Sequence, residues 1–167
     1  MSPPRKEIKN PVLRSVLATD AEALRGLYAY SLRHNPAGFI QNPAFRGDIF
    51  ERTQKYREEN GEILGLFLPD GTLIGFGGLQ KKKDGLCELC NLHLHPDFQG
   101  QGLGRHMCEH LINLARTLGY HIVELHVTAT QKRALDLYRR LGFVETKRQE
   151  YAVELQKFET VFMELRL

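Results

Sequence analysis

The feature that most constrains this chain is a glycine-rich segment, Gln99-Gly100-Gln101-Gly102-Leu103-Gly104, between a predicted strand and the clearest predicted helix. The strand, Leu86 to Leu94, should stop near Pro96, because proline has no N–H to donate to a sheet. The helix, Leu103 to Leu118, has apolar residues at the three- and four-residue spacing of one helix face. A helix start has unpaired N–H groups and a partial positive charge, so this turn is suited to an anion such as phosphate.

Arg105 adds a cation at the same helix start. A cation there opposes the helix dipole, so we expect a bound anion to compensate it. The spacing is not Gly-x-x-x-x-Gly-Lys-Ser/Thr, which disfavours a Walker-type nucleotide site. Nor is it a Gly-x-Gly-x-x-Gly that follows a first strand at the N-terminus, which disfavours a dinucleotide fold.

The remaining elements predict one α/β domain of mixed (α+β) character, residues 11–167, after a polar tail, residues 1–10. A lysine run, Lys81 to Lys83, stands before Asp84-Gly85 and is most simply a solvated turn; the alternative is a rim that attracts anions. Pro69-Asp70-Gly71 predicts a hairpin. The predicted strands are 12–17, 63–68, 73–80, 86–94, 122–127, 143–153 and 159–166, and the predicted helices are one capped by Thr19 or Asp20 and then 48–60, 103–118 and 131–141.

Composition excludes several classes of protein. No apolar stretch approaches the ~18 residues that a membrane span needs, and the polar, basic start lacks the apolar core of a signal peptide. Three cysteines are too few for a disulfide framework, so a cytoplasmic protein is the default expectation. A net charge of +3 is too small to argue for nucleic acid.

A metal site is not expected either. Cys87-x-x-Cys90, with His93 and His95 nearby, has the residue types of a zinc site. However, positions 87 and 90 of a strand point to opposite faces, so the two thiols cannot share one ion. Both cysteines are better explained as small buried apolar residues.

Three blocks together resemble the GCN5-related N-acetyltransferase (GNAT) family: Leu92-His93-Leu94-His95-Pro96, Gln99-x-x-Gly102-x-Gly104 and Ala134-x-x-Leu137-Tyr138-x-x-x-Gly142-Phe143. The resemblance implies a mixed, mostly antiparallel sheet of six to seven strands with helices on both faces. Two central parallel strands would splay apart, here 86–94 and 122–127. The pantetheine arm of acetyl-CoA, the cosubstrate, would lie in that gap.

The resemblance also implies roles for single residues. The phenol of Tyr138 would point at the coenzyme sulfur and protonate the departing thiolate. Gln131 stands where the family often has asparagine and would offer its amide. The backbone of Leu92, His93 and Leu94 would pair with pantetheine, and the amides of Gln99, Gly100, Gln101, Gly102, Leu103, Gly104 and Arg105 would hold the pyrophosphate.

The implied reaction is attack of an amine on the thioester, which needs a general base and N–H donors, such as the backbone near Leu94. Glu88 is the leading candidate for the base, because a carboxylate on a central strand is costly without a purpose or partner. Glu124 and His126 share one face of the next predicted strand and compete with it. Any one of these three is also explained as a strand residue facing polar neighbours.

The acceptor is left open among amines of small molecules, amino acids and peptide N-termini. In the family fold the loop Pro36–Gly47, with Phe39 and Phe45, and the helix with Tyr28 and Tyr30 would border the acceptor cleft. A non-catalytic acyl-CoA-binding sensor is the alternative function, since it needs the glycine turn but neither Tyr138 nor a base. The chain is expected to be a monomer or a homodimer, in which the strand Glu159–Arg166 could pair across a two-fold axis.

Overall fold

The computed structural model describes residues 8–34, 47–153 and 155–167. The predicted tail therefore lies mostly outside the described residues, as does the loop with Phe39 and Phe45. The strands are β1 (Val12–Ser15), β2 (Glu62–Phe67), β3 (Leu73–Lys83), β4 (Leu86–Leu94), β5 (Ile122–Thr128), β6 (Val144–Val153) and β7 (Gln156–Arg166). The helices are α1 (Ala21–His34), α2 (Ile49–Glu58), α3 (Leu103–Thr117) and α4 (Lys132–Arg140), with short 3₁₀ turns at Ala18–Asp20 and Pro96–Phe98.

The seven strands form one sheet in the order β1-β2-β3-β4-β5-β7-β6. Only β4 and β5 are parallel neighbours, and the other pairs are antiparallel. A parallel pair needs a crossover, and α3 supplies it. The predicted mixed sheet, with its central parallel pair, is confirmed.

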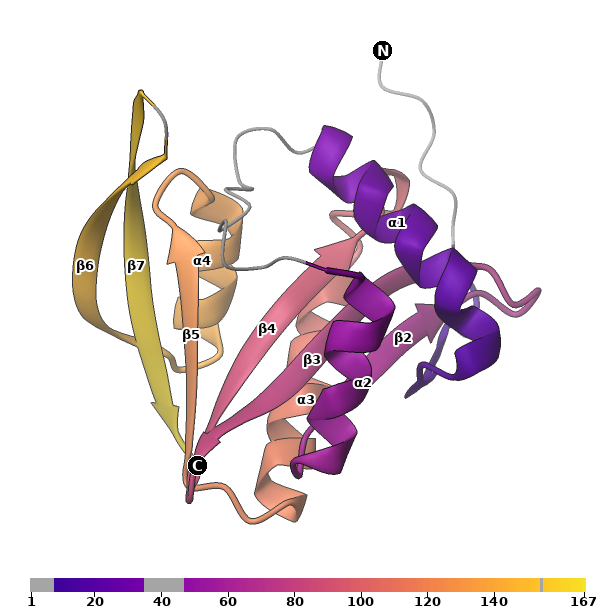
Figure 1. Ribbon diagram of the computed structural model, residues 1–167, viewed down its shortest axis with the longest axis horizontal. Coiled ribbons are helices and arrows are strands. Elements are labelled where there is room, and N and C mark those ends of the chain that lie inside the picture. Colours follow the sequence, from indigo (N-terminus) through magenta and orange to yellow (C-terminus); the bar gives the residue numbers. More distant parts are fainter. Residues whose placement is uncertain (1–7, 35–46, 154) are drawn as a thin grey trace.

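The central pair splays apart. β4 and β5 are paired only from Leu86 opposite Ile122 to Glu88 opposite Glu124. Figure 1 shows the two strands together near the C-terminus and separated at their other ends. A bulge in β4 accompanies the separation: Asn91 has a φ of 51°, and the register with β3 shifts between Phe76 and Gly78.

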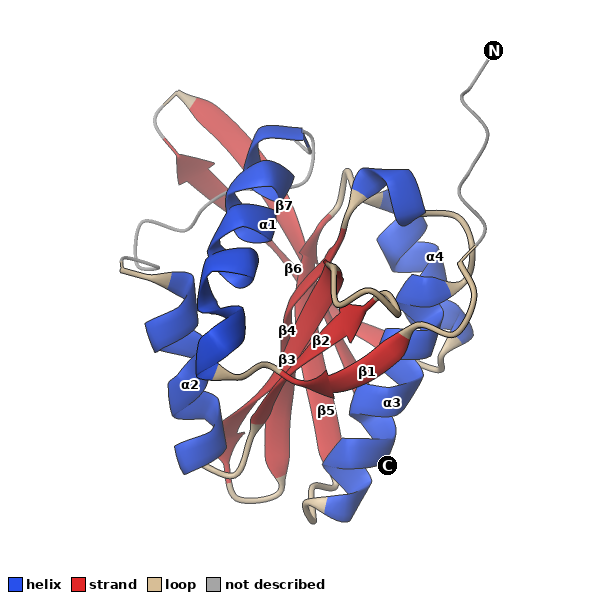
Figure 2. Ribbon diagram, turned by 90° about the vertical axis from the view of Figure 1, so that its right-hand side faces the viewer, coloured by secondary structure: helices blue, strands red, loops and turns tan. Residues whose placement is uncertain are grey.

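Helices cover both faces of the sheet, α1 and α2 on one and α3 and α4 on the other (Figure 2). Side chains of β4 alternate between these layers, as the pleat requires. Cys87 packs into the core with α3, whereas Cys90 interacts with Tyr56 of α2. The two thiols therefore lie on opposite faces, and no cluster of metal-ligating side chains occurs among the described residues.

The start of α1 differs from the sequence-based prediction. A 3₁₀ turn precedes the helix, and the Asp20 carboxylate accepts from the Leu17 N–H at 2.8 Å and from the Arg14 guanidinium at 2.7 Å. Asp20 is thus the third residue of the turn rather than the cap of the helix. β1 accordingly ends at Ser15, two residues before the predicted end.

Two strand predictions were also wrong. The lysine run belongs to β3, and the turn is made by Asp84 and Gly85. β7 lies between β5 and β6. Because both of its edges are paired, β7 has no free edge with which to extend the sheet across a two-fold axis.

Within the described segments, no helix combines the length and the apolar character required to cross a bilayer.

Candidate active site

A cavity of about 1280 Å³ opens where β4 and β5 diverge, and side chains from both helix layers line it. Gln101 and Leu103 are absent from this lining; Leu103 is buried against Phe98 and Met107. The prediction for those two concerned backbone amides, so it stays a prediction. The predicted residues that do line the cavity are Glu88, Leu92, His93, Leu94, Gln99, Gly100, Gly102, Gly104, Arg105, Gln131 and Tyr138.

The glycine turn has the geometry of an open helix start. Gly100 and Gly102 have φ of 77° and 81°, a left-handed conformation that favours glycine. Gly104 is different, because a Cβ there would meet only the Leu137 side chain, at an ordinary 3.8 Å. Packing therefore does not require glycine at 104, and its absent side chain leaves the first turn of α3 accessible from the cavity.

Cationic side chains of α3 and α4 line the cavity. Arg105, Lys132, Arg133 and Arg140 all line it. Arg105 also binds Glu109 at 2.8 Å on the next turn of α3, so the anion expected beside it is supplied at least in part by the protein. The start of α3 and these cations suit the diphosphate of a coenzyme.

The end of β4 presents its backbone to the gap. The His95 N–H donates to the Ile74 carbonyl at 2.8 Å. In an antiparallel ladder, neighbouring residues face alternate sides, so the N–H and C=O of Leu94 face away from β3 and toward β5. The Gln99 side-chain amide donates to the Leu94 carbonyl at 2.9 Å, which ties the end of the strand to the glycine turn.

Tyr138 reaches the cavity from α4 and is only 7% exposed. Its ring contacts Phe143 edge-on, with centroids 5.9 Å apart. Burial, with a smaller contribution from Cys108, raises the pKa of the phenol far above its usual value. The hydroxyl therefore keeps its proton at neutral pH, as a proton donor must.

A charged cluster lies on the face of β4 and β5 that points away from α3 and α4. Glu88 Oε1 is 2.9 Å from His126 Nε2, and Glu88 Oε2 is 3.1 Å from Lys82 Nζ. Burial raises the pKa of Glu88, but His126 and Lys82 outweigh it and hold that pKa below its usual value. In return, the hydrogen bond to Glu88 raises the pKa of His126 against the opposing effect of burial.

Glu124, the other candidate base, pairs in register with Glu88 but does not line the cavity. Burial, followed by the charge of Glu88, raises the pKa of Glu124. Of the three candidate bases, Glu88 and His126 therefore line the cavity and Glu124 does not.

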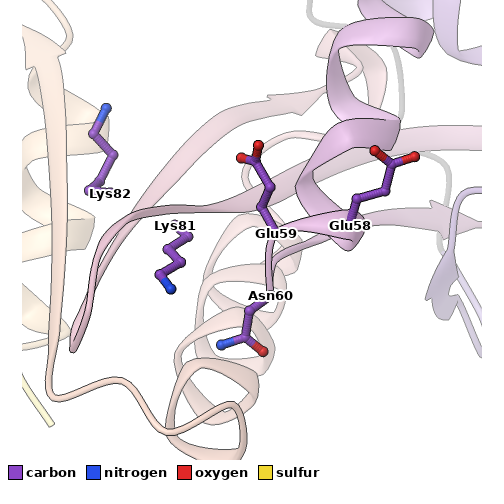
Figure 3. Close-up of a pocket in the computed structure, with 5 residues that line it drawn as sticks. All are labelled: Glu58, Glu59, Asn60, Lys81 and Lys82. Atoms are coloured by element: carbon purple, nitrogen blue, oxygen red, sulfur yellow. The ribbon is translucent and has the colours of Figure 1, made fainter.

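Lys82 reaches this cluster because of the strand pleat. Figure 3 shows Lys81 and Lys82 pointing to opposite sides of β3, around a second hollow of about 430 Å³. Lys81 binds Asp84 at 2.9 Å, on the other side from Glu88. Interpreting the whole run as a solvated turn overlooked this alternation.

Sequence reasoning also missed several residues on the α1–α2 side of the cavity. Ser31, Arg52, Tyr56 and Asn91 all line it, and Asn91 Nδ2 donates to the Tyr56 hydroxyl at 2.8 Å. Helical spacing could have identified four residues on this side, because Ser31 follows Tyr28 by three residues and Tyr56 follows Arg52 by four. Tyr28 lines the cavity as predicted.

Tyr30, also predicted to border the acceptor cleft, does not line the cavity. It stacks instead on His34 and His95, with ring centroids 3.9 and 4.6 Å apart.

Known proteins resemble this chain in both sequence and fold. "Uncharacterized N-acetyltransferase MJ1207" of Methanocaldococcus jannaschii is 28% identical over 83% of this chain and 62% of its own length. L-amino acid N-acyltransferase MnaT of Escherichia coli is 34% identical over 53% of this chain and 48% of its own length. The chain thus spans about half to three fifths of these relatives.

Two solved structures share the fold. The ribosomal-protein-S18-alanine N-acetyltransferase of Escherichia coli matches with a TM-score of 0.75 and 25% identity, over 94% of each chain. A phosphinothricin acetyltransferase from Sinorhizobium meliloti, in complex with AcCoA, matches with a TM-score of 0.81 and 19% identity, over 94% of this chain and 88% of that one.

The family model described as "Acetyltransferase (GNAT) family" matches residues 24–143, which include the splayed strands, the glycine turn and α4. The chain therefore belongs to the GNAT acetyltransferase family.

Proposed function

We propose that residues 11–167 form a single acetyltransferase domain that moves an acetyl group from acetyl-CoA to a primary amine. The observation that carries the proposal is one continuous cavity. It joins an open, cation-rimmed helix start to the Glu88–His126 pair, through the gap between two parallel strands. Acetyl-CoA, when bound, supplies the acetyl group as an activated thioester.

The chain's own groups would bind the cosubstrate at three places. The Gln99 N–H already donates to the Pro96 carbonyl at 3.3 Å. The other N–H groups of the predicted set, at residues 100–105, and the cations of Arg105, Lys132, Arg133 and Arg140 would hold the diphosphate. The backbone of Leu92 and Leu94 would pair with the pantetheine amides as an added strand would. By the same alternation the N–H and C=O of His93 face β3, so the sequence-based prediction for His93 is not carried over. Gln131, the residue before α4, would offer its amide at the far wall.

Deprotonation of the acceptor would fall to Glu88 and His126 acting as a pair. The contact between Glu88 and Nε2 favours the tautomer that carries its proton on Nε2, which leaves Nδ1 as the acceptor. Glu88 would then stabilise the imidazolium that forms. The pKa of His126 is raised above 6.5. This brings it closer to the pKa of an amine, which favours transfer of a proton from the amine to the imidazole.

Two donors would complete the reaction. The N–H of Leu94 faces the gap and would bind the acetyl oxygen as that oxygen gains negative charge. The Tyr138 phenol would give its proton to the departing sulfur.

An amine acceptor is consistent with the names of the relatives, which specify an L-amino acid and the alanine of a ribosomal protein.

The test is release of free thiol from acetyl-CoA in the presence of small amines, amino acids and short peptides. We expect release with at least one class, and a loss of roughly 10-fold or more in kcat for Tyr138→Phe. If acetyl-CoA binds but no acceptor causes it to release free thiol, the result would contradict the transferase proposal and favour a non-catalytic sensor.

A further inference from the structure

The α1–α2 side of the cavity is built from two pairs of residues at helical spacing. Tyr28 and Ser31 project from α1, and Arg52 and Tyr56 project from α2. Asn91 and His93 of β4 line the same cavity. We name these six residues the acceptor lobe; none of them is acidic.

One polar atom in this lobe points to a ligand. Ser31 is 5% exposed, and its Oγ is buried with no hydrogen-bond partner among the residues that the structure describes. A buried hydroxyl without a partner costs free energy, because its lost hydration is not replaced by another hydrogen bond. Ser31 also lines the cavity, so a ligand there is suited to complete its hydrogen bonding.

The charge of the lobe comes from Arg52. The Arg52 guanidinium lies 5.9 Å from the centroid of the Tyr28 ring and contributes to lowering the pKa of His93. Burial is the larger cause, and together they lower the pKa of His93 to about 3. His93 is therefore neutral at working pH, and stacks on Phe76 with ring centroids 4.6 Å apart.

The cavity as a whole disfavours a polycationic acceptor. Its described lining has two carboxylates, Glu88 and Asp136. Glu88 is held by Lys82 and His126, and Asp136 lies on α4, 3.7 Å from Arg139. Neither carboxylate belongs to the acceptor lobe.

We propose that the acceptor lobe recognises an amine that also carries a carboxylate, with the carboxylate on Arg52 and Ser31. This inference rests on the proposed function and narrows its acceptor from amines in general to amino-acid-like molecules. A guanidinium and a hydroxyl are a matched pair for a carboxylate, because the guanidinium donates from a planar fork and the hydroxyl adds a third donor. A neutral His93 beside them adds no second charge.

The experiment compares a set of L-amino acids with their own carboxamides as acceptors, by kcat/KM for thiol release. Each pair shares a side chain and an amine and differs in the charge of one group. We expect the wild type to use the acids, and Arg52→Gln to lower kcat/KM for the acids by roughly 10- to 100-fold and for the amides by less than about 3-fold. Ser31→Ala should lower the value for the acids by about 3- to 10-fold.

Two further variants separate recognition from structure. Lys55→Gln removes an exposed cation from the same helix outside the cavity and should change nothing. Arg52→Lys keeps the charge but loses the fork, so it should recover part of the activity. If Arg52→Gln does not fold, as judged by circular dichroism, Arg52→Lys and Ser31→Ala decide the question.

Binding separates this inference from the proposed function. In the presence of coenzyme A, N-acetyl amino acids should raise the thermal midpoint more than N-acetyl carboxamides do, and Arg52→Gln should abolish the difference. That result without any thiol release would support the subsite and contradict the transferase. Thiol release with equal use of acids and amides, or equal losses for both in Arg52→Gln, would overturn the subsite and leave the transferase standing.

Discussion

The two faces of the β4–β5 pair carry side chains of opposite character. Toward α3 and α4 the strands present Cys87, Leu89, Val123 and Leu125, each less than 5% exposed and part of one apolar core. Toward the other side they present Glu88, Glu124 and His126. Since adjacent residues point to opposite faces, a single step along a strand passes from core to charged cluster.

The difference shows where this fold can place chemistry. The apolar face contributes burial, which scales with the area removed from water. The charged face is costly for folding unless each charge has a partner, and Glu88 has two. We infer that the apolar face sets stability and that the charged face, open to the cavity, sets activity.

The largest expected effect is on catalysis. His126→Ala should lower kcat/KM by roughly 100- to 10,000-fold, because it removes the proposed proton acceptor. In the wild type the rate should rise as the pH passes upward through the raised pKa of His126, since Nδ1 must be unprotonated to accept a proton.

Glu88→Gln tests whether His126 is the base, through the pH profile of kcat/KM. Without the carboxylate the pKa of His126 should fall, so the ascending limb should move to lower pH. If that limb disappears in Glu88→Gln and survives in His126→Ala, the assignment is reversed and Glu88 is itself the base.

The next effect is on stability and compares neighbours. Leu125→Ala should lower the free energy of unfolding by about 2–5 kcal/mol, because it leaves a cavity in the core. His126→Ala, one residue along, should change it by less than about 1 kcal/mol, since that side chain is 44% exposed. Urea unfolding of both variants checks this, and equal losses would end the distinction between the faces.

Much of this comparison was available from the sequence. Apolar residues on both sides of 86–94 indicated a central strand, and the glycine turn with the Tyr138 block indicated the family. The partners of Glu88 were not available, because Lys82 and His126 come from different strands and meet it only through pairing register. Arg52 and Ser31 were missed for a related reason: an amphipathic pattern shows that a helix packs, and not which side chains border a cavity.

A smaller effect is expected at the glycine turn. Gly104→Asp should weaken coenzyme A binding by about 10- to 100-fold, because it fills the open first turn and repels phosphate. The same change should stabilise the fold, since glycine disfavours helix and an acidic residue suits a helix start. Calorimetry and thermal unfolding measure the two effects.

Gly26→Ala is the matched control for that change, because Gly26 also lies in a helix and a Cβ there meets nothing within 4 Å. It should stabilise by about 0.5–1 kcal/mol and leave binding unchanged. A Gly104→Asp variant that binds coenzyme A normally would mean that the turn does not hold the phosphates.

The smallest effect is the pH dependence of stability. The folded pKa of His126 is raised above 6.5, so its contribution is present below pH 6.5 and lost as the pH rises through the raised pKa. The pKa of Glu88 is lowered below 4.5, so its contribution is present above pH 4.5 and lost as the pH falls through the lowered pKa. The destabilisation by His126→Ala should therefore be greatest between about pH 4.5 and 6.5, and a constant difference across pH would show that the pair is not coupled.

The central claim is that the gap between β4 and β5 is the place where the coenzyme binds. A crystal structure of the chain with coenzyme A tests it directly. We expect the diphosphate on the amides of residues 100–105, the pantetheine beside Leu92–Leu94 and the sulfur within hydrogen-bonding reach of the Tyr138 hydroxyl. Coenzyme A bound elsewhere, or a sulfur remote from that phenol, would contradict the account.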